Sequence, residues 1–367
     1  MSAYRRFDGD GPLRLVQVGA GGMGRAWLRT IDAEPEVELV GVVDLDLDTA
    51  RAALAEEGIG GDVAIARTLT ELARRIRVDA VVNVTIPVAH LPVNVEALTA
   101  GIPVLCEKPA APSLRDAYRQ AAVAAVRGEL LMISQSRRYF AALDAARAQL
   151  PRIGPVSNAS TRFFREAHFS GFREEMAHPL LIDMAIHQFD VARAVMGSEP
   201  VSVVCDEHNP SWSWFAGDAE AHAVFEFAGG GRYVFTGSWV AAGEETSWNG
   251  EWWINGAEGS IRWNGEHDVQ LVRAGARDRP ERVAVPSGVP EQIAGSLREF
   301  VGALRSGATP ESTASSNVHS LAMVESAVRA AETGERVDID VVRSAALAEA
   351  IEVEQDPAVR AALATLA

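Results

Sequence analysis

The chain has 367 residues, of which 48% are hydrophobic and 23% charged, and its formal net charge at pH 7 is -16. A nucleic-acid-binding protein needs a basic face that neutralises phosphates, but the nearest basic cluster, Arg74 with Arg75 and Arg77, is typical of a solvated helix end. We therefore expect no nucleic-acid partner. The sequence has neither an apolar stretch of the ~18 residues that a membrane span needs nor a signal-peptide pattern, so we expect a cytoplasmic protein without a membrane partner.

The first third of the chain alternates strand and helix patterns. Buried strands are predicted over 13–18, 37–43, 79–84, 103–106 and 129–134. Helices are predicted directly after the first strand, over 48–57, 68–75 and 90–100, and from Ser113 onward. Continuously apolar strands that alternate with helices are typical of a parallel, doubly wound sheet. We therefore predict a Rossmann domain of roughly six strands over residues 1–135.

The turn after the first strand carries Gly19, Gly21 and Gly24 at GxGxxG spacing. Gly19 permits a tight turn, Gly21 lets a pyrophosphate approach the backbone, and Gly24 lets the helix pack closely on the strand. The second strand ends on Asp44, whose carboxylate can accept hydrogen bonds from ribose hydroxyls, although a methyltransferase also places an acid there. A carboxylate repels the 2′-phosphate of NADP and the next residue is Leu45, so we predict NAD, with NADP as the alternative.

From residue 136 onward the chain is rich in strand patterns. Strands are predicted over 156–164, 201–205, 221–227, 232–240, 251–254 and 269–272, and helices over 179–196, 290–305 and 317–333. Three consecutive glycines, 229–231, predict a hairpin. We predict an α+β domain with a large open, mainly antiparallel sheet over residues 136–345, followed by a helical tail over residues 346–367.

Lys108 is the first residue with a candidate chemical role. It follows the predicted strand 103–106, and ligands of doubly wound sheets bind beyond the carboxyl ends of the strands. A cation at such a place can stabilise the charge that develops on a reacting oxygen. The alternative is an ordinary surface lysine in a loop.

Asp183 and His187 form a second candidate pair. They lie four residues apart in the predicted helix 179–196, hence on one face, among apolar residues. An aspartate beside a histidine makes the imidazole more basic, which suits removal of a proton from a hydroxyl; a buried pair that ties the helix to the sheet is the alternative. A metal site built from these residues and His178 lacks an evident fourth ligand, so we expect no metal.

These motifs resemble those of the glucose–fructose oxidoreductase, inositol dehydrogenase and MocA family over nearly the whole chain. The similar segments are GAGGMG at 19–24, Asp44, TIP at 85–87, CEKP at 106–109, DMAIHQFD at 183–190 and NGEWWINGAEGSIRW at 249–263. The resemblance implies a Rossmann domain and a second domain whose open sheet serves oligomer contacts, so a homo-oligomer, a dimer or tetramer, is expected. It also implies that Lys108, Asp183 and His187 serve the reaction.

The resemblance extends the set of candidate residues. Candidates for binding the cofactor are Gly19, Gly21, Gly22, Met23, Gly24, Asp44, Thr85, Pro87, His90, Glu107 and Lys108. The aromatic-rich stretch that many relatives carry after the sixth strand is replaced here by SQSRRY at 134–139, and the candidates for substrate contact are Arg137, Tyr139 and His178.

The resemblance and the residues together predict an NAD-dependent oxidoreductase. It would transfer a hydride from a secondary hydroxyl of a sugar, sugar derivative or cyclitol, or run the reverse reduction. The alternatives are an NADP-dependent reductase of another carbonyl compound and an NAD-binding sensor without turnover.

Overall fold

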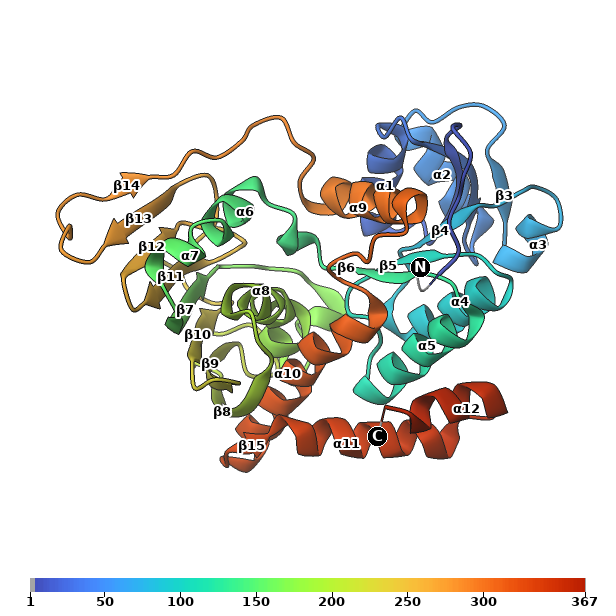
Figure 1. The fold of residues 1–367 in the computed structure, drawn as a ribbon. Helices are drawn as coiled ribbons and strands as arrows, with labels where there is room; N and C mark the ends of the chain where they lie inside the picture. The colour runs from blue at the N-terminus through green and yellow to red at the C-terminus, as the bar shows by residue number, and fades with distance from the viewer. Residues whose placement is uncertain (1–3, 367) are drawn as a thin grey trace. The chain divides into compact units, whose positions relative to one another are not determined.

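The computed structural model describes residues 4–366, which fall into two compact units (Figure 1). The first unit contains the residues up to 136, residues 290–318 and the residues from 344 on, and the second contains residues 137–289 and 319–343. These units differ from the predicted ranges 1–135, 136–345 and 346–367, because two later segments of the chain pack with the first unit.

The first unit is built on a six-stranded parallel sheet in the order β3-β2-β1-β4-β5-β6. Its strands are β1 (Leu13–Val18), β2 (Val37–Val43), β3 (Ala64–Ala66), β4 (Ala80–Asn83), β5 (Val104–Glu107) and β6 (Leu131–Ser134). All residues of β4, β5 and β6 are buried, as expected for strands covered on both faces. This strand order is that of a doubly wound dinucleotide-binding fold, so the predicted Rossmann fold is confirmed.

Helices follow most of these strands, and local capping sets where several of them begin. They are α1 (Gly22–Asp32), α2 (Leu47–Glu56), α3 (Leu69–Ala73), α4 (Pro87–Thr99) and α5 (Leu114–Arg127). The side chains of Asp46, Thr68 and Ser113 accept hydrogen bonds from backbone N–H groups in the first turns of α2, α3 and α5, which satisfies donors that a helix start leaves open.

Two helices from the last fifth of the chain complete the first unit. Helix α9 (Gln292–Ser306) packs against α1 and β6, and α12 (Pro357–Ala364) packs against α5 (Figure 1). Arg119 of α5 donates to Glu354 over 3.0 Å, and Arg127 donates to Asp356 over 3.0 Å. The chain therefore returns to its first unit at its end.

The second unit is built on a nine-stranded sheet in the order β14-β13-β12-β11-β7-β10-β9-β8-β15. Its strands are β7 (Val156–Phe164), β8 (Pro200–His208), β9 (Glu220–Phe227), β10 (Arg232–Ser238), β11 (Glu251–Gly256), β12 (Gly259–Trp263), β13 (Val269–Arg273), β14 (Glu281–Arg282) and β15 (Val337–Asp338). Only the pairing of β7 with β10 is parallel, so the predicted mainly antiparallel sheet is confirmed. The predicted triglycine hairpin joins β9 to β10, with positive φ at Gly229 and Gly230.

One face of this sheet packs against α8 (Ile186–Met196). Phe189 of that helix meets the rings of Phe225 and Phe235 edge to face, with centroids 4.8 and 5.4 Å apart. The other helices that contain residues of this unit are α6 (Ala141–Arg147), α7 (Leu150–Ile153), α10 (Ala314–Thr333) and α11 (Ile339–Val353).

The single helix predicted over 179–196 is two elements in the structure. Residues Leu180–Ala185 form a π-helix, and α8 begins only at Ile186. An apolar pattern does not distinguish the wider π turn from an α turn, and such turns are frequent at functional sites. Asp183 therefore lies on the π-helix and His187 on α8.

A cluster of charged residues joins α8 to α10 within the second unit. Arg193 donates twice to Glu199, over 2.6 Å each, and Glu199 lies 3.7 Å from Nδ1 of His319. Burial is the main cause that lowers the pKa of His319 to about 4; the charges of Arg343 and Arg193 act in the same direction, and those of Glu199 and Asp340 oppose it. His319 is therefore neutral in the folded protein at neutral pH.

No helix among residues 4–366 has both the length and the apolar character required to cross a membrane.

Candidate active site

The glycine-rich turn between β1 and α1 has no room for side chains at two of the three glycines of the GxGxxG pattern. Gly19 has a φ of 99°, and a Cβ there would lie 2.7 Å from the carbonyl oxygen of Val84. A Cβ on Gly24 would lie 2.6 Å from the carbonyl oxygen of Gly19. Both contacts are with backbone atoms, which cannot move aside cheaply, so these positions require glycine.

Gly21 differs from the other two glycines because its surroundings are open. It caps the N-terminus of α1 without a side-chain hydrogen bond, and no atom lies within 4 Å of where its Cβ would be. The first turn of α1, which begins with Gly22 and the half-exposed Met23, contains no acidic residue. A helix start with unpaired N–H groups, no side chain in the way and no competing carboxylate suits a pyrophosphate.

Asp44 stands at the end of β2, beside this turn. Its Oδ2 accepts a hydrogen bond from the backbone N–H of Ala20 over 2.9 Å, and its Oδ1 accepts one from Asp46 N–H over 2.9 Å. The carboxylate is thus held at the glycine turn, and its contact with the ribose hydroxyls stays a prediction. A guanidinium that the sequence analysis missed is also close: Arg67, which follows β3, donates to the carbonyl oxygen of Leu45.

Lys108 directly follows β5, and its backbone is held by the residue before it. Glu107 accepts hydrogen bonds from the indole N–H of Trp27 over 2.8 Å and from the backbone N–H of Lys108 over 3.0 Å. The Glu107 carboxylate is buried. It therefore positions Lys108 relative to α1, and a direct contact of Glu107 with a cofactor stays a prediction.

Lys108 has a further distinction that can be read from the sequence. It is the only lysine of the chain, and the other 33 of the 34 basic residues are arginines. Arginine stays charged under all ordinary conditions, whereas lysine is a compact cation that can lose its proton. The single lysine thus stands at the carboxyl end of a central strand of the dinucleotide-binding sheet.

His90 joins two loops at the same edge of this sheet. Its ring is fully buried, with Nδ1 2.7 Å from the carbonyl oxygen of Pro109 and Nε2 3.0 Å from that of Thr85. Burial lowers the pKa of His90. Because both ring nitrogens face backbone carbonyls, His90 positions the turn at Thr85 and the segment after Lys108.

The remaining two predicted cofactor residues lie beside His90. Thr85 donates its hydroxyl to Asn83 over 2.7 Å, and Pro87 is the first residue of α4. The first unit thus brings the glycine turn, Asp44, Thr85 and Lys108 to the carboxyl ends of β1, β2, β4 and β5, the edge at which such sheets bind ligands.

In the second unit, His187 and Arg137 lie near each other. Both belong to the lining of one narrow hollow. Its lining residues are Arg137, His187, Gln188, Val191, Asn249 and Trp263. Asp183, on the preceding π-helix, accepts a hydrogen bond from Nε of Arg173 over 3.0 Å. Tyr139 is half-buried just after the short 3-10 helix Ser136–Arg138.

His178 has a different set of neighbours. Its Nδ1 lies 2.7 Å from Oε2 of Glu207, and its Nε2 lies 3.5 Å from Oε1 of Glu332. The predicted substrate candidate thus belongs to a carboxylate cluster of its own.

The fold and the residues of the first unit define a class, the dinucleotide-binding oxidoreductases. Two family models cover most of the sequence: "Oxidoreductase family, NAD-binding Rossmann fold" matches residues 13–135, and "GFO/IDH/MocA C-terminal domain" matches residues 148–262. The chain therefore belongs to the GFO/IDH/MocA family, its first domain binds NAD, and it is a dehydrogenase-type enzyme.

Several proteins are similar to this chain. The uncharacterized protein y4oX of Sinorhizobium fredii is 28% identical, covering 89% of this chain and 95% of its own length. A 1,5-anhydro-D-fructose reductase of Ensifer adhaerens is 26% identical, covering 88% and 97%. An inositol 2-dehydrogenase of an Arthrobacter species is 33% identical, but over only 52% of this chain and 56% of its own length.

A solved structure has the same fold. The crystal structure of an oxidoreductase from Agrobacterium radiobacter in complex with NAD+, L-tartaric acid and magnesium superposes with a TM-score of 0.80 and 19% identity. The match covers 90% of this chain and 99% of that one. At this identity the likeness supports the fold alone.

Proposed function

We propose that this protein is an NAD-dependent dehydrogenase that oxidises a secondary hydroxyl of a sugar, sugar derivative or cyclitol, or runs the reverse reduction. The observation that carries the proposal is the single lysine of the chain, which follows β5 on a backbone held by Glu107 and Trp27. The names of the relatives, an inositol dehydrogenase and an anhydrofructose reductase, support the substrate class.

The proposed roles follow from the chemistry of each side chain. The Lys108 ammonium donates a hydrogen bond to the reacting oxygen and stabilises the negative charge that develops on it. His187 accepts the hydroxyl proton as the general base. Asp183, steadied by Arg173, orients His187 or binds a neighbouring hydroxyl. When bound, NAD supplies the acceptor for the hydride that leaves the carbinol carbon, and the product is a carbonyl compound.

The test measures NADH formation over a panel of cyclitols and sugars, for the wild-type protein and for Lys108→Met and His187→Gln. General acid–base catalysis contributes about 10²- to 10⁴-fold, so each variant should lose at least about 100-fold in kcat/KM. The dissociation constant for NAD should change little in His187→Gln. Near-wild-type turnover in both variants, or no turnover by the wild type on any panel member, would refute the proposal.

The single lysine allows its role to be separated from that of His187. Reductive methylation with a ¹³C-labelled reagent marks only Lys108 and the chain's amino terminus, so NMR can follow the Lys108 signal alone. We expect this signal to shift when substrate is added to the NAD complex of His187→Gln, because Lys108 is proposed to contact the reacting oxygen. A Lys108 signal that substrate leaves unchanged would contradict that role.

NADP use is the second candidate, and one observation favours it. The guanidinium of Arg67 bonds to the carbonyl of Leu45, next to Asp44, and arginines are the usual partners of the 2′-phosphate. We expect repulsion by Asp44 to dominate, so NAD should bind at least tenfold more tightly than NADP. If NADP binds more tightly, and if Arg67→Ala removes that preference, the NAD assignment is wrong.

A homo-oligomer through the open sheet is also part of the proposal. Exposed apolar side chains stand on β8, β9 and β11, namely Val201, Val204, Val224 and Trp253. Apolar groups on one sheet are typical of a surface that is covered by a partner. Light scattering on the wild type and on Trp253→Glu tests this proposal; an unchanged monomer in both samples would contradict it.

A further inference from the structure

We propose that His178, Glu207 and Asp218 form a binding site for one divalent transition-metal ion, with zinc as the best match. This site uses none of the residues to which the dehydrogenase reaction is assigned above. It also departs from the expectation, drawn from the sequence, that the chain holds no metal.

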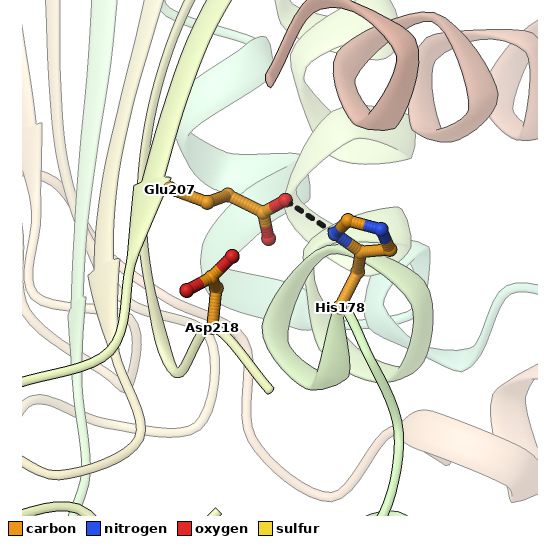
Figure 2. Close-up of side chains that lie close together, drawn as sticks. All are labelled: His178, Glu207 and Asp218. Carbon is orange, nitrogen blue, oxygen red and sulfur yellow. Dashed lines mark hydrogen bonds and ion pairs between the residues drawn. The ribbon is translucent and has the colours of Figure 1, made fainter. Parts of the chain in front are cut away.

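The three side chains come from different elements of the second unit. His178 precedes the π-helix, Glu207 lies near the end of β8, and Asp218 lies in the loop before β9. One ligand atom of each lies within 4.8 Å of the others. Figure 2 shows the imidazole and the two carboxylates pointing toward one another, with Glu207 between its two neighbours.

Glu207 carries the observation that points to a ligand. Its side chain is only 2% exposed, and its Oε2 lies 2.7 Å from Nδ1 of His178. Its other oxygen, Oε1, is buried and has no hydrogen-bond partner among the described residues. Leaving a buried carboxylate oxygen without a partner costs free energy. In Figure 2 this carboxylate faces Asp218. The Asp218 carboxylate can donate no hydrogen bond when it is ionised. A cation between the two carboxylates would satisfy both.

Backbone packing holds Asp218 in this place. The N–H of Asp218 donates to the carbonyl of Ala177 over 2.9 Å, and Ala216 N–H donates to Glu174 over 2.8 Å. Between them, a Cβ on Gly217 would lie 2.1 Å from the carbonyl oxygen of Ala177. The loop therefore lies directly against the segment that ends at His178, and only glycine allows this approach.

The electrostatics of the cluster also suit a cation. Three carboxylates, those of Glu207, Asp218 and Glu332, lie around one imidazole. Carboxylates gathered in a partly buried place repel one another. A bound dication would offset this repulsion.

The donor set selects among metals. Magnesium and calcium prefer oxygen ligands, whereas zinc accepts imidazole nitrogen and carboxylate oxygen, and open zinc sites have three protein ligands and a water. Ligand atoms that bind zinc tetrahedrally at ~2 Å stand about 3.3 Å apart. This separation lies between the 2.7 Å from Nδ1 of His178 to Oε2 of Glu207 and the 4.8 Å within which all three ligand atoms lie. Zinc on Nδ1 of His178 would leave Nε2 facing Glu332, 3.5 Å away, where carboxylates commonly orient metal-bound histidines.

A metal here would also hold the start of the π-helix. The carbonyl of His178 accepts the N–H of Ile182 over 3.1 Å, in the first turn of that helix. Fastening His178 to β8 and to the loop at Asp218 would therefore stabilise the folded second unit, so zinc should raise the melting temperature.

The experiment measures zinc binding to the full chain after removal of any affinity tag and dialysis against a chelator. Isothermal titration calorimetry with zinc chloride is run on the wild type, on Glu207→Gln and on Asp218→Asn, with magnesium chloride as the comparison metal. Glu226→Gln is the matched control, because Glu226 is a carboxylate of the same sheet whose partners are Arg232 and Arg336. Circular dichroism and melting curves without metal check that each variant folds.

We expect one equivalent of zinc to bind to the wild type and to Glu226→Gln, with much weaker binding of magnesium. Each ligand variant should bind zinc at least about 100-fold more weakly, since loss of even an outer partner costs roughly 10- to 100-fold, and zinc should no longer raise its melting temperature. The proposal is overturned if the wild type binds no zinc. It is also overturned if both folded ligand variants bind zinc as the wild type does. Because no readout depends on turnover, failure of the dehydrogenase proposal would leave this result intact.

Discussion

Substituting Asp190 with asparagine should strongly destabilise the second unit. Asp190 lies on α8, where Nε and Nη2 of Arg138 donate to its carboxylate over 2.5 and 3.1 Å. The hydroxyl of Ser320 donates to the same carboxylate over 2.5 Å. The side chains of Arg138 and Asp190 are 8% and 2% exposed, so this ion pair is shielded from water.

The magnitude follows from the burial of the partner that remains. Removing one charge of a buried ion pair costs about 3–5 kcal/mol. Asparagine keeps the shape and one acceptor oxygen for Ser320, so we expect the lower end, about 3 kcal/mol. Arg193, whose Nη1 lies 3.6 Å from Asp190, keeps its two hydrogen bonds to Glu199 in the variant and so adds little to this cost.

Urea unfolding followed by tryptophan fluorescence measures this loss, because seven of the eight tryptophans lie in the second unit. With m values of about 1–3 kcal/mol/M, the midpoint should fall by roughly 1–3 M. Glu251→Gln is the control, since its 2.6 Å pair with Arg162 is exposed and exposed pairs contribute little. A shift in Asp190→Asn no larger than that of the control would refute this reasoning.

Three further predictions concern the glycine turn, pH and the support of Lys108. Gly24→Ala should weaken NAD binding at least tenfold by equilibrium titration, because the new Cβ would meet the carbonyl of Gly19. As pH falls from 6.5 to about 4, His319 gains a proton in the unfolded chain but not in the folded protein. The free energy of unfolding should therefore fall by up to about 3 kcal/mol over this range. Urea titrations of the wild type should show this loss, and those of His319→Gln should not. Trp27→Phe removes a hydrogen-bond donor from buried Glu107, which should lower the free energy of unfolding by about 1–3 kcal/mol. The melting temperature should then fall by a few degrees.

Each of these predictions has a contradicting result. Unchanged NAD affinity in folded Gly24→Ala would show that the turn can widen. Parallel pH profiles for the wild type and His319→Gln would show that this histidine is not held neutral. A melting temperature equal to that of the wild type in Trp27→Phe would mean that the bond to Glu107 contributes nothing net.

The fold was predictable wherever the chain repeats an apolar pattern beside turn residues. The runs at 13–18 and 37–43 match β1 and β2 residue for residue, and the run at 156–164 matches β7. Short elements were missed: β14 has two residues, and β12 follows a turn closely. The return of α9 and α12 to the first unit was also missed, because it depends on tertiary packing that no local pattern encodes.

Candidate site residues could be named from the sequence only where the spacing of residues in a motif indicates a chemical role. Gly19, Gly24 and Asp44 follow from the motif as candidates; the structure shows that the two glycines have no room for a Cβ and that Asp44 accepts a hydrogen bond from Ala20. Arg67 and Glu207 belong to no motif, since each approaches its partner only through the fold of the sheet. The occurrence of a single lysine was a signal available in the sequence all along.

The return of the chain to its first unit bears on how the protein is made. Domains usually fold in the order in which they leave the ribosome. Here the parallel sheet can form early, but the helix that packs on α5 is synthesised only after all of the nine-stranded sheet. Until then, Arg119 and Arg127 lack the carboxylates of Glu354 and Asp356. The nascent dinucleotide-binding unit therefore emerges with one helix face uncovered, a face on which a chaperone could bind before the last residues arrive.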